Sequence, residues 1–396
     1  METTTNHWMR VNARPDVRMV RGEGSYLWDH TGKRYLDFIQ GWAVNCLGHS
    51  PAVVRAAVLA QFDQVLNVGP AHFNDPALRL SERLAQLSGL DRVFLANSGV
   101  EANEAAVKLC RKWGQQNRPG AYEVITTLGG FHGRTLAMTS ATGKPGWDEA
   151  YPPRVEGFRK VPYGDVNAAA DAISERTVAI LVEPIQGEAG AVVPPRGYLR
   201  ALRELCDSRG ILLVLDEIQT GIGRTGPLFA FEDESVRPDV VTLGKGLGGG
   251  LPISAVLATQ GAACFRDGDH GSTFGGNALC SAAALGVLAE LAGPEARARR
   301  QQSSRILESA LEALARSFGG TLRGRGHLFG LVLPGDDAAR IQERAFEQGL
   351  LLNAPRPSVL RFMPQLLVSA AEVEEMSNIL RQVWRSERPS QMAATG

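Results

Sequence analysis

The chain has 396 residues, 44% of them hydrophobic and 21% charged, which suits a globular protein with room for two domains. Lysine plus arginine equals aspartate plus glutamate, at 42 each, so the basic surplus that nucleic acids and anionic membranes attract is missing. The start of the chain lacks the apolar core of a secretory signal, and no stretch approaches the roughly 18 apolar residues of a membrane span. We therefore expect a small-molecule partner, with no nucleic acid and no membrane.

Five cysteines are spread along the chain without a CxxC pair. Their odd number and wide spacing argue against a disulfide framework or a zinc site, so we expect no metal. Reduced, mostly buried thiols indicate a cytoplasmic protein. The five are Cys46, Cys110, Cys206, Cys264 and Cys280.

Helical and strand-like segments alternate through the middle of the chain. ILLVLDE at 211–217 is a continuous apolar run bounded by acids, typical of a strand that is buried on both faces. The helix before it, at 198–209, is expected to stop at Gly210, a residue type that favours helix ends. Further helices are expected at 76–88 and 100–113, and further strands at 92–96, 179–184 and 240–244. This alternation predicts an α/β domain with a mostly parallel sheet and ligand chemistry at the strand ends.

The C-terminal part has a different pattern. A long amphipathic helix is expected over 294–318, and Ser369 and Glu372 have the S-x-x-E spacing of a capping box before another helix. Between them lie two short strand-like pieces, LFGLVL and VLRFM. We interpret this region as a second, smaller α+β domain.

The strongest chemical signal is the pair Asp216 and Lys245, each of which follows an apolar run. A lysine in a confined site, with a lowered pKa, can attack a carbonyl carbon. A carboxylate that faces a pyridine nitrogen keeps it protonated, so that the ring can accept electrons. Taken singly, Asp216 is as well explained by a helix cap or a salt bridge, and Lys245 by a solvated turn.

The sequence GKGLGG around Lys245 also matches the glycine pattern of dinucleotide-binding sites. That pattern requires a helix directly after the glycines. Here Leu251-Pro252 and the strand-like ISAVLAT follow instead, so we reject a dinucleotide site.

Two further segments offer ligand groups. Ser98 and Gly99 lie between a strand and a helix, where free amides can hold a phosphate, although Ser98 alone also suits plain N-capping. Phe131 can stack on a ring and Arg134 can clamp a carboxylate, but a core phenylalanine and a surface arginine would look the same. Taken one at a time, these segments do not distinguish a ligand-binding role from an ordinary structural one.

Two hydroxyl side chains and one possible ion pair complete the set of candidates. Ser272 and Thr273 offer hydroxyl donors among glycines, in what would otherwise be a simple turn. A buried Arg361 would need a partner, and Glu188 could supply it if the fold brings the two together.

Six stretches, in this order, resemble one known family over almost the whole chain: YLDFIQGWAVNCLGH, NSGVEANE, FHGRTL, EPIQGE, DEIQTGIGRTG and TLGKGLGGG. They are similar to the class III, or ornithine-type, aminotransferases, and within that family to the bacterial branch that acts on acetylornithine. The resemblance implies the fold type I of enzymes that use pyridoxal 5′-phosphate, with a large domain around a mostly parallel sheet and a smaller α+β domain. On this basis we assign residues 51–285 to the large domain, and residues 1–50 and 286–396 to the small one.

The resemblance also implies a role for each candidate residue. Lys245 would carry pyridoxal 5′-phosphate as a Schiff base and shuttle the substrate proton, and Asp216 would pair with the ring nitrogen. The remaining cofactor contacts would be Ser98, Gly99, Val100, Phe131 on the ring face, Gln219 and, from the neighbouring subunit of a homodimer, Thr273. The substrate contacts would be Arg134 and the nearby Ser272 for the distal carboxylate, Arg361 for the α-carboxylate of glutamate or 2-oxoglutarate, and Glu188, which would neutralise Arg361 when the other substrate is bound.

The implied reaction moves the δ-amino group of N2-acetylornithine to 2-oxoglutarate, giving N-acetylglutamate 5-semialdehyde and glutamate, in arginine biosynthesis. Asn12 stands where some ornithine-specific relatives carry a tyrosine, which favours an acylated donor. Alternatives left open are ornithine, succinylornithine, succinyldiaminopimelate or 4-aminobutyrate as the amine, an aminomutase, and a homologue that only binds its ligand.

Overall fold

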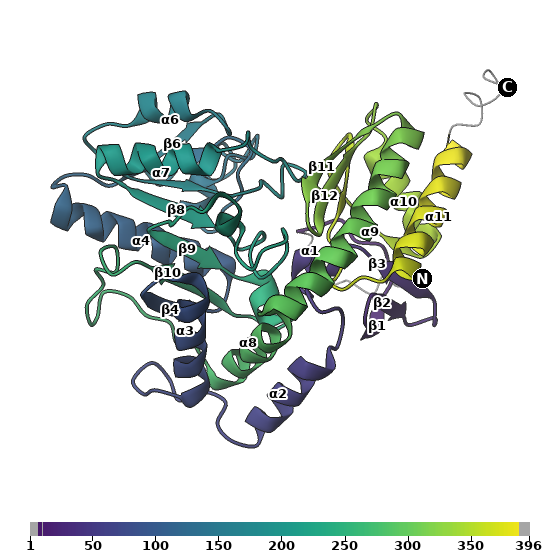
Figure 1. Ribbon diagram of the computed structural model, residues 1–396, viewed down its shortest axis with the longest axis horizontal. Helices are drawn as coiled ribbons and strands as arrows, with labels where there is room; N and C mark the ends of the chain where they lie inside the picture. The colour runs from purple at the N-terminus through teal and green to yellow at the C-terminus, as the bar shows by residue number, and fades with distance from the viewer. Residues whose placement is uncertain (1–6, 10, 388–396) are drawn as a thin grey trace.

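The protein is described by a computed structural model that covers residues 7–9 and 11–387, and it consists of a larger and a smaller unit side by side (Figure 1). Strands of the larger unit form one sheet of seven in the order β4-β10-β9-β8-β7-β5-β6. The strands are β4 (Arg92–Ala96), β5 (Glu123–Thr127), β6 (Phe158–Val161), β7 (Thr177–Val182), β8 (Leu212–Asp216), β9 (Val240–Leu243) and β10 (Ser254–Ala258).

The sheet is parallel from β9 to β6, and only β10 runs antiparallel to its neighbours β9 and β4. All residues of β5, β7, β8, β9 and β10 are buried, because helices pack against the sheet, which explains their continuous apolar runs. The helices of this unit are α2 (Ala52–Phe62), α3 (Asp75–Ser88), α4 (Gly99–Asn117), α5 (Leu136–Ala141), α6 (Val166–Ala172), α7 (Tyr198–Arg209) and α8 (Ala278–Leu291). The predicted fold class, with its mostly parallel central sheet, is confirmed.

The smaller unit joins the two ends of the described chain. Its first sheet has the order β1-β2-β3-β13, so that N-terminal strands pair with Leu350–Leu351, and Figure 1 shows the purple start of the chain beside the yellow end. Its second sheet has the order β11-β12-β15-β14. The strands are β1 (Met19–Glu23), β2 (Tyr26–Asp29), β3 (Arg34–Asp37), β11 (Thr321–Arg325), β12 (Leu328–Val332), β13 (Leu350–Leu351), β14 (Asn353–Arg356) and β15 (Val359–Phe362).

Three helices cover these sheets: α9 (Pro294–Phe318), α10 (Ala338–Glu347) and α11 (Ala370–Glu387). Leu36 and Phe38 share a core with residues of α9 and α11, whereas Cys46 and Val54 belong to the core of the large sheet. The chain therefore passes from the small to the large unit between Phe38 and Cys46, although the assigned domain boundaries stay a prediction. A short turn, α1 (Gln40–Ala43), lies in this crossing.

Several local expectations are confirmed. Helices α7 and α9 span the predicted ranges, and α7 ends at Gly210, which has the left-handed φ of 59°. Ser369 and Glu372 form the expected capping box, because each backbone amide donates to the other residue's side chain. Only the short 3-10 turn Lys245–Gly248 separates Lys245 from β10, so the helix that the dinucleotide pattern requires does not follow the glycines.

All five cysteines are free, and only Cys264 is not buried. Within residues 7–9 and 11–387, no single helix has the length and apolar character of a membrane span; α8 and α9 meet that test only jointly, across a bend of 76°.

Candidate active site

A cavity of about 240 Å³ lies at the carboxyl ends of β8 and β9, where the chemistry-bearing residues gather. Asp216 is the last residue of β8, and Lys245 stands two residues beyond β9. Carboxyl ends of parallel strands share one edge of a sheet, which is why residues distant in sequence meet there. The cavity is lined by Gly99, Val100, Asn103, Phe131, His132, Gly133, Arg134, Glu183, Glu188, Asp216, Ile218, Gln219 and Lys245.

The Asp216 carboxylate is buried and held by two side chains. Its Oδ2 accepts hydrogen bonds from His132 Nδ1 and Asn103 Nδ2, both at 2.8 Å. Asn103 is itself oriented by Thr242, whose hydroxyl donates to Asn103 Oδ1 at 2.8 Å. Burial alone would lower the pKa of His132, but the hydrogen bond and charge of Asp216 raise it overall. The arrangement keeps a fixed carboxylate that has further lone pairs for a ligand N–H.

Lys245 is held in a constrained backbone conformation next to that carboxylate. Its φ of 41° lies in the left-handed region, which is strained for a residue with a side chain. Burial lowers the pKa of Lys245, and the nearby Arg361 charge adds to this, while Glu188 and Asp216 oppose it. A lowered pKa leaves more of the amine neutral, which is the form that attacks a carbonyl.

The N-terminus of α4 opens onto the cavity. Ser98 is the N-cap of this helix, and its hydroxyl accepts from Glu101 N at 3.4 Å. Glu101 in turn accepts from Ser98 N at 3.1 Å, so Ser98 is engaged in a capping box and does not line the cavity. Gly99 and Val100 do line it, and amides in the first turn of a helix have no intrahelical acceptor. The amides of Gly99 and Val100 are thus the better phosphate donors.

Glu183 ties two loops of the site to the end of β7. Its Oε1 accepts from the Phe131 amide at 2.8 Å, and its Oε2 accepts from the Gly187 amide at 3.4 Å. Burial raises the pKa of Glu183 to about 7, although the charge of His132 opposes this. The contact sets the position of the Phe131 ring in the cavity wall.

Arg361 and Glu188 form the ion pair that the sequence could only suggest. Arg361 Nη2 lies 2.8 Å from Glu188 Oε1, and the side chain of Arg361 is 0% exposed whereas that of Glu188 is 24% exposed. Arg361 also donates to Gly187 O at 2.7 Å and to Asn353 Oδ1 at 2.9 Å. Burial would raise the pKa of Glu188, but the charges of Arg361 and Lys245 lower it.

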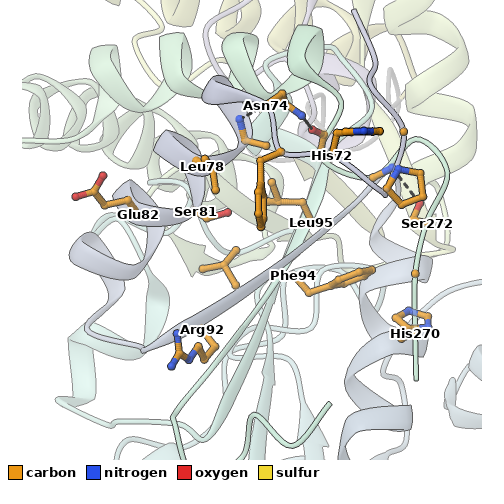
Figure 2. A pocket seen from close by; sticks show the side chains of 18 of the residues that line it. His72, Asn74, Leu78, Ser81, Glu82, Arg92, Phe94, Leu95, His270 and Ser272 are labelled. Atoms are coloured by element: carbon orange, nitrogen blue, oxygen red, sulfur yellow. Dashed lines mark hydrogen bonds between the residues drawn. The ribbon is translucent and has the colours of Figure 1, made fainter. Parts of the chain in front are cut away.

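The remaining substrate and cofactor candidates are divided between this cavity and a second one. Arg134 is exposed at the mouth of the first cavity, with its guanidinium 5.0 Å from the centre of the Phe131 ring. Ser272 instead lines a separate cavity of about 650 Å³ beside α3, as Figure 2 shows, and accepts from Asn97 Nδ2 at 3.1 Å. Thr273 is exposed next to it. Within one chain, neither hydroxyl lines the cavity that holds Lys245.

The cavity fits the cofactor that the sequence implies. Both amide atoms of Gln219 are buried and make no hydrogen bond within the described part of the chain, so the Nε2 donor calls for a ligand oxygen. A Cβ at Gly187 would stand 1.6 Å from Gln219 Oε1, so only glycine leaves the amide its place. Together with Asp216, Lys245 and the free amides of α4, this donor set matches a phosphorylated pyridine aldehyde.

Four residues that shape the site had been given no role from the sequence. Asn103 and His132 orient Asp216, Glu183 positions Phe131, and Trp147 packs edge-on against Phe131 with ring centres 5.7 Å apart. His132 and Glu183 lay inside motifs already quoted, so their position beside named candidates was an available signal. Asn103 sits one helical turn beyond Gly99, which would place it on the same face.

Comparisons with known proteins agree with this geometry. Residues 9–384 match the family described as aminotransferase class-III. The chain is 50% identical to acetylornithine aminotransferase 2 of Bordetella bronchiseptica, over 94% of this chain and 95% of that protein. It is similar to the N-acetylornithine aminotransferase of Stenotrophomonas maltophilia, with a TM-score of 0.83 and 37% identity over 95% of this chain and 97% of the other.

A third similar protein is the ornithine aminotransferase of Toxoplasma gondii, with a TM-score of 0.91 and 33% identity over 97% of this chain and 94% of the other. That structure holds pyridoxal phosphate at partial occupancy in its active site. The family match covers nearly the whole chain, and the donor set of the cavity suits the same cofactor. The chain therefore belongs to the class III aminotransferases, a family of enzymes that depend on pyridoxal 5′-phosphate.

Proposed function

We propose that this enzyme transfers the δ-amino group of N2-acetylornithine to 2-oxoglutarate, giving N-acetylglutamate 5-semialdehyde and glutamate, as a step of arginine biosynthesis. Relatives that carry the acetylornithine aminotransferase name share 44–50% identity with it over most of both chains. The structural observation that carries the proposal is the ion pair of Arg361 with Glu188. The pair lets one site accept two substrates, of which only one carries a carboxylate next to the reacting carbon.

Each residue of the cavity has one task in this reaction. When bound, pyridoxal phosphate supplies a carbonyl for amine exchange and a ring that withdraws electrons from the substrate carbon. Asp216, fixed by His132 and Asn103, keeps a proton on the ring nitrogen. Lys245 holds the cofactor through its Nζ and moves the proton at the reacting carbon, for which its lowered pKa suits it.

The ring and its phosphate are held by groups around that centre. The amides of Gly99 and Val100 bind the phosphate, with Ser98 acting through the helix cap. Phe131 would stack on the ring, and Gln219 would donate from Nε2 to the phenolic oxygen, which would give this buried amide a partner.

The two half-reactions differ at Arg361. Glutamate and 2-oxoglutarate carry an α-carboxylate next to the reacting carbon, and Arg361 binds it in place of Glu188. Acetylornithine reacts through a terminal amine without that carboxylate, so Glu188 returns and Arg361 does not stay buried without a charged partner, which would cost about 3–5 kcal/mol. Arg134 at the mouth holds the distal carboxylate of either substrate.

The test begins with the absorption spectrum of the purified holoenzyme during titration with N2-acetylornithine. We expect the cofactor band to shift on addition of the amine and to return on addition of 2-oxoglutarate. Lys245→Ala should lower turnover by roughly 10⁴-fold, because it removes both the covalent link and the proton carrier. Lys33→Ala, on the surface of the small unit, is the control and should keep wild-type turnover. Normal turnover by Lys245→Ala would refute the proposed role.

A panel of amines then tests the substrate. We expect kcat/KM to be highest for N2-acetylornithine and lower for ornithine, succinylornithine, succinyldiaminopimelate and 4-aminobutyrate. A preference for free ornithine or 4-aminobutyrate would assign the enzyme to another branch of the family. An isomerised product without net transfer to 2-oxoglutarate would identify an aminomutase.

We further propose that the enzyme is a cytoplasmic homodimer in which Thr273 and Ser272 of one subunit reach the cofactor and substrate of its partner. Large apolar side chains are exposed in α2, in the segment between α2 and α3 and next to Thr273, and a second copy would bury them. These are Leu59, Phe62, Leu66, Phe73 and Phe274. Light scattering should give twice the chain mass, and Phe73→Asp with Phe274→Asp should yield monomers without activity. The free thiols suit a reducing compartment, which cell fractionation would check.

A further inference from the structure

Phe131 and Arg134 line the Lys245 cavity, and Trp147 and Lys144 extend them into an aromatic and cationic cluster beside it. Trp147 lies edge-on to Phe131, with ring centres 5.7 Å apart. The Arg134 guanidinium is 5.9 Å and the Lys144 ammonium 5.0 Å from the centre of the Trp147 ring. One indole therefore lies within reach of two cations, next to the ring that lines the cavity.

The segment that bears Trp147 is anchored by its own ion pairs. Asp148 pairs with Arg154 at 2.8 Å and with the largely buried Lys160. The Trp147 amide donates to Lys144 O at 3.2 Å, so both residues belong to one turn. The acid that directly follows Trp147 is thus engaged by other cations and does not neutralise the charges of Arg134 and Lys144.

A donor bound to Arg134 by its distal carboxylate places its α-nitrogen beside this cluster. A free α-ammonium would stand close to two cations, and like charges at such distances repel. An acylated nitrogen carries no charge and adds a planar amide that can pack on the indole. The two donors therefore differ in their interaction with Trp147 and Lys144 even though their reacting ends are identical.

Building on the proposed function, we propose that Trp147 and Lys144 select the donor at its α-nitrogen, so that the site takes α-N-acylated ω-amino acids and rejects those with a free α-ammonium. Trp147 contributes the attractive contact with the acyl amide. Lys144 contributes repulsion of the charged competitor. Neither residue touches the reacting atoms, and both act on specificity.

Three donors isolate this effect, since they share the terminal amine and the carboxylate and differ only at the α-carbon. They are 5-aminopentanoate, N2-acetylornithine and ornithine, which carry hydrogen, acetamide and ammonium there. We measure kcat/KM of each with the holoenzyme and divide by the value for 5-aminopentanoate. The wild-type ratio should be above one for N2-acetylornithine and below one for ornithine.

Trp147→Ala should lower the acetylornithine ratio by about 10-fold, and Trp147→Phe, which keeps a ring, should restore most of it. Lys144→Glu should raise the ornithine ratio by about 10-fold, because the variant offers the α-ammonium an opposite charge. Lys33→Glu, the same reversal on the small unit, should leave both ratios unchanged.

Unchanged ratios in Trp147→Ala and Lys144→Glu would overturn the inference, and so would an equal fall for all three donors. The failure of the proposed function has a different signature. In that case the wild-type enzyme itself would show no preference for N2-acetylornithine, whatever the variants do.

Discussion

Two regions of the molecule bury arginine side chains in opposite ways. In the active site, Arg361 is paired with a carboxylate, Glu188, that is itself partly exposed. Between the two units, Arg224 and Arg300 are as deeply buried but are bound by backbone carbonyls. A carboxylate on a side chain can be exchanged for a substrate carboxylate, whereas a backbone carbonyl is fixed by the fold. We call the exchangeable pair of Arg361 and Glu188 the switch, and the fixed contacts of Arg224 and Arg300 with backbone carbonyls the clamp.

The clamp connects segments that are far apart in sequence. Arg224 follows β8 and donates to His327 O at 3.2 Å and to Pro364 O. Arg300 lies in α9 and donates to Leu291 O and, at 3.4 Å, to Gly226 O. Burial lowers the pKa of Arg224 to about 10, which leaves it charged at neutral pH. Changes to the switch should therefore affect catalysis, and changes to the clamp should affect stability.

Among changes to the switch and the clamp, the largest effect is expected for Arg361→Ala. The half-reaction with 2-oxoglutarate should slow by about 10³-fold, or about 4 kcal/mol, because the α-carboxylate loses its buried cation. The half-reaction with acetylornithine should slow by less than about 10-fold, since it does not use that cation. Rapid-mixing spectroscopy of each half-reaction measures both. Equal losses would contradict the switch, and Arg356→Ala, from the neighbouring strand β14, serves as control.

Arg224→Met tests the clamp. Loss of the charged hydrogen bonds to two buried carbonyls should lower the free energy of unfolding by about 3 kcal/mol. The rate per folded active site should stay within about 2-fold of wild type, because Arg224 does not line the cavity. Urea denaturation of the holoenzyme gives the stability, and the exposed Arg237→Met provides the comparison. If Arg224→Met kept its stability but lost activity, Arg224 would act in catalysis and the assignment of the clamp to stability would be wrong.

Glu188→Gln tests the switch by removing the charge of its carboxylate. Arg361 would then keep a neutral partner in the acetylornithine half-reaction, and we expect that half to slow by about 10-fold, or about 1.4 kcal/mol. Binding of 2-oxoglutarate should become tighter, because no carboxylate competes for Arg361. Titration calorimetry of the pyridoxamine form with 2-oxoglutarate would reveal this; weaker binding would count against competition.

The smallest effect concerns pH and His327. Burial, with the charges of Arg224 and Arg300, keeps the pKa of His327 well below its usual 6.5. Below pH 6.5, His327 therefore binds a proton in the unfolded chain but not in the folded chain. Its contribution to the free energy of unfolding is fully present above pH 6.5 and is lost as the pH falls below that value. Between pH 7 and 5.5 the loss should be about 1 kcal/mol from this residue. Over the same pH range, the free energy of unfolding of His327→Gln should therefore fall by less than that of the wild type, by the same amount. An equal fall in the two proteins would contradict this role of His327.

The sequence predicted local structure well because its signals are local. The limits of α7 and α9 follow from helical periodicity and from the glycines after them, and the capping box before α11 involves residues three apart. The sheet of β1, β2, β3 and β13 was not foreseen from residue patterns, since it joins opposite ends of the chain. Short strands paired over such distances leave no periodic signal that identifies their partners.

For the site, the sequence by itself determined which residue types follow the apolar runs, and the joint order of six motif stretches sufficed to name the family and the roles of Asp216 and Lys245. Only the tertiary structure decided which groups act together. His132 and Asn103, 84 and 113 residues away from Asp216, converge on one of its oxygens, and Glu188 meets Arg361 across the two units. Such contacts depend on how packed elements bring side chains into one low-dielectric space, where burial makes each partner obligatory.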